Sequence, residues 1–344
     1  MIQYLTKQEG VKIVVDYFAC TFPLKVQEDE LEVKIVDDLV HAISEFLGFT
    51  NEEIVKEEYS TNRYRYQYTL GESVTIRLGG PELAIGYKSC QIELRGQGCR
   101  EVEAHTSKNW IDIFSFFTLI LQGTPTRLDI AIDDYEGKYC TQDQIKETLD
   151  KGNFITSFRN RDYTLHGNDK SGWSIQFGSH KSTQMLVIYD KLKEQISKGN
   201  TTEQTFWIRY EMRYMKEKAY NVVLTYIENK IENFNKYSYG LLYKMLDLKE
   251  DNNYNEHNVG NAPTIKFWSD FLDNVEKAEI GKYKINVKNL ETYQSWIIPI
   301  ISSYYLIMFL HSGKDFALTY TNMLEPIVEY LSTFDKKKIK EDGS

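Results

Sequence analysis

The sequence lacks the residues and motifs that mark several common classes of protein. Its four cysteines in 344 residues show no CxxC spacing, which argues against a zinc site and fits a reduced cytosol. None of its six histidines forms an apolar-flanked His-x-His pair, so a metal ion would have to be bound by carboxylates, which favours Mg²⁺ or Mn²⁺. The chain also has no GxxxxGK(S/T) loop, GxSxG elbow, HExxH motif or dinucleotide fingerprint, and this argues against the enzyme classes that depend on them.

Long hydrophobic runs and a positive net charge are also missing. No apolar run reaches the ~20 residues that a membrane-spanning helix needs, and the nearest candidate, residues 296–310, is too short and contains two serines. The first ten residues, MIQYLTKQEG, do not resemble a signal peptide. The net charge of −9 argues against a protein that coats DNA indiscriminately, because nonspecific affinity depends on cations that neutralise phosphates. We therefore expect a cytoplasmic protein with no membrane partner, which would need local basic patches to bind a nucleic acid.

The first third of the chain predicts a strand, a helix and then a series of short strands. With 42% hydrophobic and 14% aromatic residues, the chain can form a sizeable core and two or three domains. Residues 11–22 are expected to form a core strand, and residues 28–47 an amphipathic helix. Between residues 64 and 95, closely spaced apolar runs separated by glycines indicate an antiparallel meander. The segment GQGCREVE at 96–103 is expected to be a turn, and residues 109–121 a helix.

A second series of elements begins with a strand at 127–135. It continues with a helix at 141–151, a strand pair at 172–177 and 185–190, a short helix at 190–198 and a strand at 205–214. Helices are expected at 216–234, 239–246, 264–275 and 290–310, with a linker at 251–263. Because segments 11–122 and 126–230 both run from strands into helix, the fold class is expected to be α+β, with twisted antiparallel sheets in two similar halves, helices on one face and a helical C-terminal region. The expected domains are residues 1–122, 123–235 and 236–344.

Charged side chains alternate with apolar ones in two of these strands. Asp129 and Asp133 share one face of the strand at 127–135. Asp129 lies in mid-strand between two apolar residues, where burial is costly unless a cation, a metal or hydrogen-bond donors accompany it. In the strand at 205–214, Arg209, Glu211 and Arg213 share a face, which indicates either an exposed ladder of alternating charge or a site for phosphate and metal.

The stretch QMLVIYDKLKEQ, residues 184–195, places Tyr189 where a strand ends and a helix begins. With 25 tyrosines in the chain, a tyrosine chosen at random is most often a packing or surface residue. Tyr189 differs because carboxylate-bearing strands lie on either side of it in sequence. A tyrosine near acidic metal ligands is suited to cleaving a phosphodiester.

Three segments in this order, TRLDIAIDDY, IQFGSHKSTQMLVIYDKLKEQ and WIRYEMR, resemble the Rep_trans family. This family comprises rolling-circle plasmid replication initiators and related nicking relaxases of Gram-positive conjugative elements. The resemblance covers about residues 10–275, and GGPE at 79–82 and GQGCREVE are more similar to the subgroup found on integrative elements. It implies an enzyme that nicks one DNA strand at an origin and leaves a tyrosine on the 5′ phosphate and a free 3′ hydroxyl.

The resemblance also implies roles for individual residues. Tyr189 would be the nucleophile and Lys191 would accompany it, while Asp133 and Glu194 could be ligands or orienting groups. Arginine holds phosphates in a forked geometry that lysine cannot reproduce. The full set is Tyr189, Lys191 and Glu194 for catalysis; Asp129, Glu211 and, as third candidate, Glu93 for Mg²⁺ or Mn²⁺; and Arg127, Arg209, Arg213, Arg95 and Arg100 for DNA.

The expected partners are a DNA origin, either an oriT or a double-strand origin, and a host helicase, with a homodimer as one open oligomeric state. Within the resemblance, a nickase of a conjugative element is slightly favoured over a plasmid initiator. Two alternatives remain: an origin-binding protein without catalysis, and a metal-dependent nuclease that hydrolyses DNA. A covalent protein adduct on the 5′ phosphate would distinguish nicking from both.

Overall fold

The fold is given by a computed structural model of the protein, which describes residues 10–25, 29–84, 87–159, 161–168, 172–229, 231, 233–251 and 259–283. The described residues belong to one compact unit, Met1–Ile285, built on an antiparallel sheet. The predicted helix at 290–310 lies outside the described residues. None of the helices in the described part of the chain combines the length and the apolar character needed to cross a bilayer.

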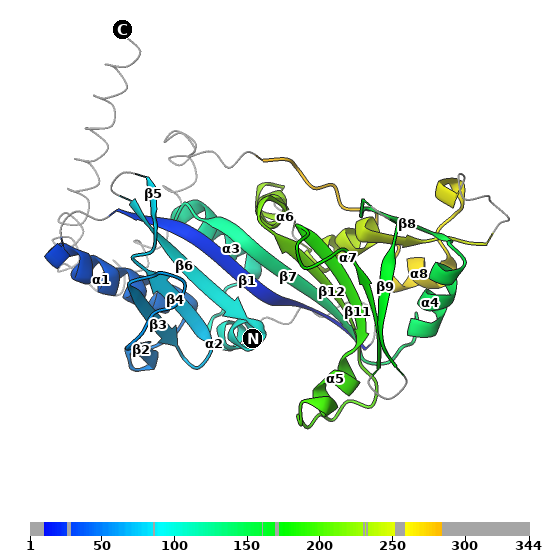
Figure 1. The fold of residues 1–344 in the computed structure, drawn as a ribbon, viewed down its shortest axis with the longest axis horizontal. Helices are drawn as coiled ribbons and strands as arrows, with labels where there is room; N and C mark the ends of the chain where they lie inside the picture. Colours follow the sequence, from blue (N-terminus) through cyan, green and yellow to red (C-terminus); the bar gives the residue numbers. More distant parts are fainter. Residues whose placement is uncertain are drawn as a thin grey trace, which may run out of the picture. The chain divides into compact units, whose positions relative to one another are not determined.

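The sheet has eleven strands and is continuous across both halves of the described chain. Its two central strands, β1 and β7, pair antiparallel along most of their length. The order outward from β1 is β6, β4, β3 and β2, and the order outward from β7 is β12, β11, β10 and β9, while β5 pairs only with β6 (Figure 1). The strands are β1 (Val11–Lys25), β2 (Ile54–Lys56), β3 (Tyr66–Leu70), β4 (Val74–Leu78), β5 (Glu82–Ala84), β6 (Tyr87–Arg95), β7 (Thr124–Asp134), β9 (Tyr163–Asn168), β10 (Gly172–Phe177), β11 (Gln184–Asp190) and β12 (Ile208–Met215).

The two halves of the sheet repeat one another. Each half begins with a central strand, continues through a helix to the outer edge, and returns inward to a strand beside the central one. The central strand is β1 in the first half and β7 in the second, and the adjacent returning strand is β6 or β12. Because β1 and β7 are antiparallel, the halves are related approximately by a two-fold rotation. The predicted α+β fold with two similar antiparallel halves is confirmed, and the halves join in a single sheet.

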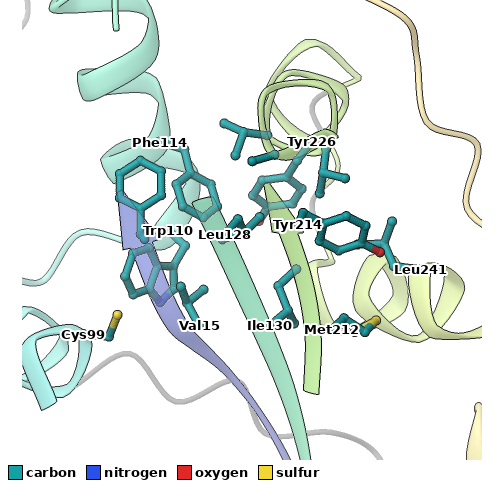
Figure 2. Packing of buried hydrophobic residues seen from close by; sticks show 14 of the residues in the cluster. Val15, Cys99, Trp110, Phe114, Leu128, Ile130, Met212, Tyr214, Tyr226 and Leu241 are labelled. Atoms are coloured by element: carbon teal, nitrogen blue, oxygen red, sulfur yellow. The ribbon is translucent and has the colours of Figure 1, made fainter. Parts of the chain in front are cut away.

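One face of this sheet forms the hydrophobic core with the helices. Val15, Leu128, Ile130, Met212 and Tyr214 point from the three strands β1, β7 and β12 towards Trp110, Phe114, Tyr226 and Leu241 on helices (Figure 2). Because side chains alternate along a strand, the residues between these point to the opposite face of the sheet.

The helices are α1 (Asp29–Leu47), α2 (Gly96–His105), α3 (Trp110–Ser115), α4 (Gln142–Asp150), α5 (Lys191–Ser197), α6 (Glu217–Glu228), α7 (Phe234–Met245) and α8 (Lys266–Phe271), with short helical turns at Asn51–Glu53, Phe116–Ile120 and Val259–Asn261.

The turn expected at 96–103 is wrong, because this segment forms helix α2. Gly98 serves close packing rather than a turn, because a Cβ at this position would lie 2.7 Å from the carbonyl oxygen of Ser73. The helix expected at 216–234 also ends early, at Glu228, and α7 begins at Phe234. Beyond it, β13 (Leu246–Leu248) pairs with β8 (Phe154–Thr156), so the start of the predicted C-terminal region pairs with the second half.

Candidate active site

Tyr189 is the last residue but one of strand β11, just before helix α5. Asp190 ends the strand and caps the helix, because its Oδ1 accepts a hydrogen bond of 2.8 Å from the backbone N–H of Lys193. In the sheet, Tyr189 is opposite Arg209 in β12 and Ser174 in β10, which places its side chain on the face away from the core. Its hydroxyl donates a hydrogen bond of 3.1 Å to Oε2 of Glu211. The predicted nucleophile therefore lies in direct contact with one of the predicted carboxylates.

The carboxylates of Glu211 and Asp129 lie on adjacent strands and share one arginine. Arg213 Nη2 is 2.9 Å from Glu211 Oε1, and Arg213 Nε is 3.2 Å from Asp129 Oδ2. A second arginine, Arg127, donates through Nε to both oxygens of Asp129, at 3.0 and 3.2 Å. The structure thus brings together Tyr189, Glu211, Asp129, Arg127 and Arg213.

Burial disfavours the charged form of two of these groups. Asp129 is 2% exposed, and this burial, together with the nearby charge of Glu211, raises the pKa of its carboxyl to about 6 against the lowering effect of Arg127. Burial also raises the pKa of the Tyr189 hydroxyl well above its ordinary value, and the charge of Glu211 acts in the same direction. Tyr189 is therefore protonated at neutral pH, and its hydroxyl proton is directed at Glu211.

Lys191 and Glu194 form an ion pair beside the tyrosine, on the first turns of α5. Lys191 Nζ is 2.6 Å from Glu194 Oε2 and 5.6 Å from the centroid of the Tyr189 ring. Although burial alone would raise the pKa of Glu194, hydrogen bonds from Lys191 and Lys198 lower it to about 2. Glu194 is consequently ionised and holds the Lys191 ammonium next to Tyr189.

Arg209 is a buried link between strands. Its Nε and Nη2 donate to the two oxygens of Asp133 at 2.7 and 2.8 Å, and Nη1 lies 2.9 Å from Asp16 Oδ1. Trp207 Nε1 also donates to Asp133 Oδ1, at 2.7 Å. Asp16 was absent from the predicted site. It is located where the register of β1 against β7 shifts between Val15 and Tyr17, and a bulge of this kind has no dependable signature in a single sequence.

The structure does not bring the remaining predicted residues into this cluster. Glu93 is opposite Ala19 of β1, which is opposite Arg127 of β7, so two strand spacings of about 5 Å each separate β6 from β7. Its carboxylate accepts hydrogen bonds from Tyr17, Arg77 and Arg95. Arg100 lies on α2 and donates to the carbonyl oxygen of Val15 and to Glu103, at 2.6 and 2.9 Å.

The donor chemistry of Asp129 and Glu211 fits a hard divalent cation. Mg²⁺ is commonly held by one or two carboxylates, with water and substrate phosphates completing its shell. Within the described residues, no group of three or more His, Cys, Asp and Glu side chains is placed to hold a metal ion. A cation here would therefore be bound by two protein carboxylates, and it would compete with Arg213 for them.

Comparisons with known proteins identify the family of the chain and relatives of similar sequence and fold. The family described as "Replication initiation factor" (Rep_trans) matches residues 123–316, and "Rolling Circle replication initiation protein N-terminal domain" matches residues 12–119. A "Putative DNA relaxase NicK" of Bacillus subtilis (strain 168) is 29% identical over 284 residues, which cover 77% of this chain and 74% of that protein. The solved "Structure of Rolling Circle Replication Initiator Protein from Geobacillus stearothermophilus" is similar with a TM-score of 0.60 and 23% identity, over 80% of this chain and all of that one, and shows likeness of fold.

Proposed function

Because the chain belongs to the Replication initiation factor family, we propose that it is a DNA-nicking enzyme that cuts and rejoins one strand of an origin through a covalent bond to Tyr189. The observation that supports this proposal is the hydrogen bond from the Tyr189 hydroxyl to Glu211, on a face of the sheet that also bears Arg127 and Arg213. A tyrosine, a proton acceptor and phosphate-binding cations are what such a strand transfer requires.

In the proposed step, the Tyr189 oxygen attacks the scissile phosphorus while its proton passes to Glu211 Oε2. The bond from phosphorus to the 3′ oxygen breaks, and the Lys191 ammonium, 5.6 Å from the centroid of the Tyr189 ring, supplies the proton that completes the 3′ hydroxyl. The 5′ phosphate remains on Tyr189 as an ester. Attack by a 3′ hydroxyl on this ester reverses the step, and this reversibility distinguishes a nicking and joining enzyme from a hydrolytic nuclease.

The arginines would bind the phosphate and the carboxylates would hold a divalent ion. The side chains of Arg127 and Arg213 are 27% and 21% exposed, so both can be reached from solvent while they are held by Asp129. Asp129 and Glu211 are the residues that would hold Mg²⁺ or Mn²⁺. The chemistry that such an ion supplies when bound is polarisation of the scissile phosphate.

The proposed partners are an origin in DNA and a host helicase, with a homodimer as the oligomeric state to test. The likeness to a protein named as a putative DNA relaxase supports the nicking relaxase within this proposal, and a conjugative element is the proposed source of the origin.

The test is to incubate the protein with single-stranded candidate origin oligonucleotides and Mn²⁺, and to analyse the products on a denaturing gel. With the label at the 3′ end, nicking should yield a protein-linked product that protease digestion shortens to a peptide adduct. With the label at the 5′ end, it should yield a shorter oligonucleotide free of protein. Binding without cleavage would indicate an origin-binding protein, and cleavage without an adduct would indicate a hydrolytic nuclease.

A further inference from the structure

The repeat of the two halves gives each half a strand with glutamate and arginine two residues apart on the polar face. In β12 these are Glu211 and Arg213, and in β6 they are Glu93 and Arg95. Both pairs occupy the same place in their half: Arg213 is opposite Asp129 of the central strand β7, and Arg95 is opposite Tyr17 of the central strand β1. In both pairs the arginine binds the glutamate, at 2.9 and 3.2 Å. We call Glu93, Arg95, Tyr17 and Arg77 the N-terminal copy.

Two equivalent positions carry different residues in the N-terminal copy and in the nicking site. On the outer side, Tyr189 lies opposite the residue two before Glu211, and Arg77 lies opposite the residue two before Glu93. Arg77 thus occupies the position of the nucleophile. On the inner side, Tyr17 occupies the position of Asp129. The copy therefore has one carboxylate where the nicking site has two, and it has no tyrosine at the nucleophile's position.

These two differences give the N-terminal copy a net positive charge. It carries two arginines against the single carboxylate of Glu93. In the nicking site, the carboxylates of Asp129 and Glu211 match the charges of Arg127 and Arg213. A net positive group of this kind attracts phosphate in the absence of a metal.

The two arginines of the copy have different environments. The Arg77 side chain is 6% exposed, and it donates to Glu93 Oε2 and to Thr61 Oγ1, both at 2.8 Å. The Arg95 side chain is 70% exposed, and its Nε is 3.2 Å from Glu93 Oε1. Arg77 and the Tyr17 hydroxyl thus hold the Glu93 carboxylate. This carboxylate in turn binds Nε of Arg95, whose side chain is exposed.

We propose that the N-terminal copy is a second, non-nicking phosphate-binding site for the DNA strand, in which Arg95 contacts a phosphate and Glu93, Arg77 and Tyr17 position it. This inference rests on the proposed function. The strands β1 and β7 separate β6 from β12, so the two sites are about 14 Å apart across the sheet at the usual strand spacing. Arg127 lies between them, with its guanidinium carbon 3.9 Å from the centroid of the Tyr17 ring. The strand would cross the sheet over Arg213, Arg127 and Arg95.

The test measures binding without chemistry, in a Tyr189→Phe background. The probe is a fluorescent single-stranded oligo(dT) of about 12 nucleotides, within the usual site size for such strands, and its anisotropy is followed over a series of salt concentrations. Arg95→Gln should weaken binding about threefold to tenfold and reduce the slope of log K against log salt by about 0.7, the value for one lost phosphate contact on a single strand. The matched control is Lys266→Gln. It also removes an exposed cation, since the Lys266 side chain is 81% exposed, but Lys266 lies on α8, which packs on the opposite, core face of the sheet. It should leave the slope unchanged.

A slope that is the same in Arg95→Gln and in its parent would overturn the proposal, as would a parent that does not bind the oligonucleotide. A second readout uses the protein with Tyr189 intact and an origin oligonucleotide. There Arg95→Gln should raise the DNA concentration for half-maximal adduct formation and leave the rate at saturating DNA unchanged. A lost rate at saturation would assign Arg95 to catalysis and contradict the proposal. If the protein with Tyr189 forms no adduct at all, the proposed function fails. The salt slopes still show whether Arg95 contacts a phosphate of the bound strand.

Discussion

The Tyr189 hydroxyl donates its hydrogen bond to Glu211 from one strand to the next, with an oxygen to oxygen distance of 3.1 Å. The two residues are not directly opposite in the sheet: Tyr189 is opposite Arg209, and Glu211 is opposite Val187. They meet diagonally, within the reach of a long aromatic side chain and a glutamate. The proposed nucleophile and its proposed proton acceptor are therefore positioned by strand pairing, which makes their geometry independent of loops.

Tyr189→Phe should abolish adduct formation and leave DNA binding in place. The change removes one oxygen and keeps the ring, so the loss of stability should be about 1 kcal/mol at most. The measurement is the gel for protein-linked DNA together with a binding titration, and no divalent metal should restore the adduct.

Tyr163→Phe is the matched control for this variant. Tyr163 also donates to a carboxylate, Asp150 Oδ1 at 2.6 Å, but it lies opposite Phe177 on the core side of the sheet. This variant should form the adduct normally. An adduct in Tyr189→Phe, mapped by mass spectrometry to another tyrosine of the polar face such as Tyr17, would show that a different tyrosine is the nucleophile.

Glu211→Gln should lower the rate of adduct formation by about 10² to 10⁴, the usual contribution of a positioned general base. The amide keeps the size of the side chain but cannot accept the proton of Tyr189. Single-turnover rates at saturating DNA measure this effect. Glu194→Gln should cause a smaller loss, because Glu194 acts by holding Lys191; an equal loss in both variants would argue against Glu211 as the base.

The sequence was sufficient to predict the strands that carry the site, because Asp129, Glu211 and Tyr189 all lie in segments with clear alternation or strand-end character. The two-fold repeat was also readable, as two successive runs of strands into helix. It was not evident that the halves share one sheet, since the pairing of β1 with β7 joins residues more than 100 positions apart, which no local pattern encodes.

The parts of the site that sequence could not predict depend on register. Asp16 reaches Arg209 because β1 has a bulge, and Glu93 lies with Tyr17 and Arg77 because of its place opposite Ala19. The same limit explains the error at 96–103: glycines that suggest a turn also permit a helix to approach Ser73 closely. Local composition does not separate these two uses of glycine.

Arg209→Lys should destabilise the fold by roughly 2 to 4 kcal/mol. A lysine ammonium cannot bridge Asp133 and Asp16 as the planar guanidinium does, and a buried carboxylate without its partner is costly. Urea unfolding measures the change. The control is Lys266→Gln, which breaks the exposed pair with Asp270 and should cost well under ~1 kcal/mol. Equal effects of the two variants would contradict a linking role for Arg209.

The stability of the metal-free protein should decrease as pH rises from about 4 to about 6 through the ionisation of Asp129. The pKa of Asp129 is about 6 in the folded protein and ~3.9 when unfolded. Over this interval the folded state binds more protons than the unfolded state, so deprotonation favours unfolding, by at most ~2 to 3 kcal/mol. Urea unfolding with a chelator present, at both ends of this interval, should show this contribution in the wild type and its loss in Asp129→Asn. Identical pH dependence in both proteins would refute it.

Arg213→Gln should strengthen Mn²⁺ binding in the absence of DNA. The Arg213 guanidinium lies between Asp129 and Glu211, so its charge opposes a cation at the same carboxylates, and its removal leaves two carboxylates that repel each other until a cation binds. We expect about tenfold tighter binding by calorimetry, which corresponds to ~1.4 kcal/mol, and a larger rise in melting temperature with Mn²⁺ than in the wild type. Arg95→Gln is the matched control, because Arg95 pairs with a single carboxylate, Glu93, and its loss should not change the affinity. Weaker or unchanged Mn²⁺ binding in Arg213→Gln would place the ion elsewhere and leave Arg213 as a phosphate ligand alone.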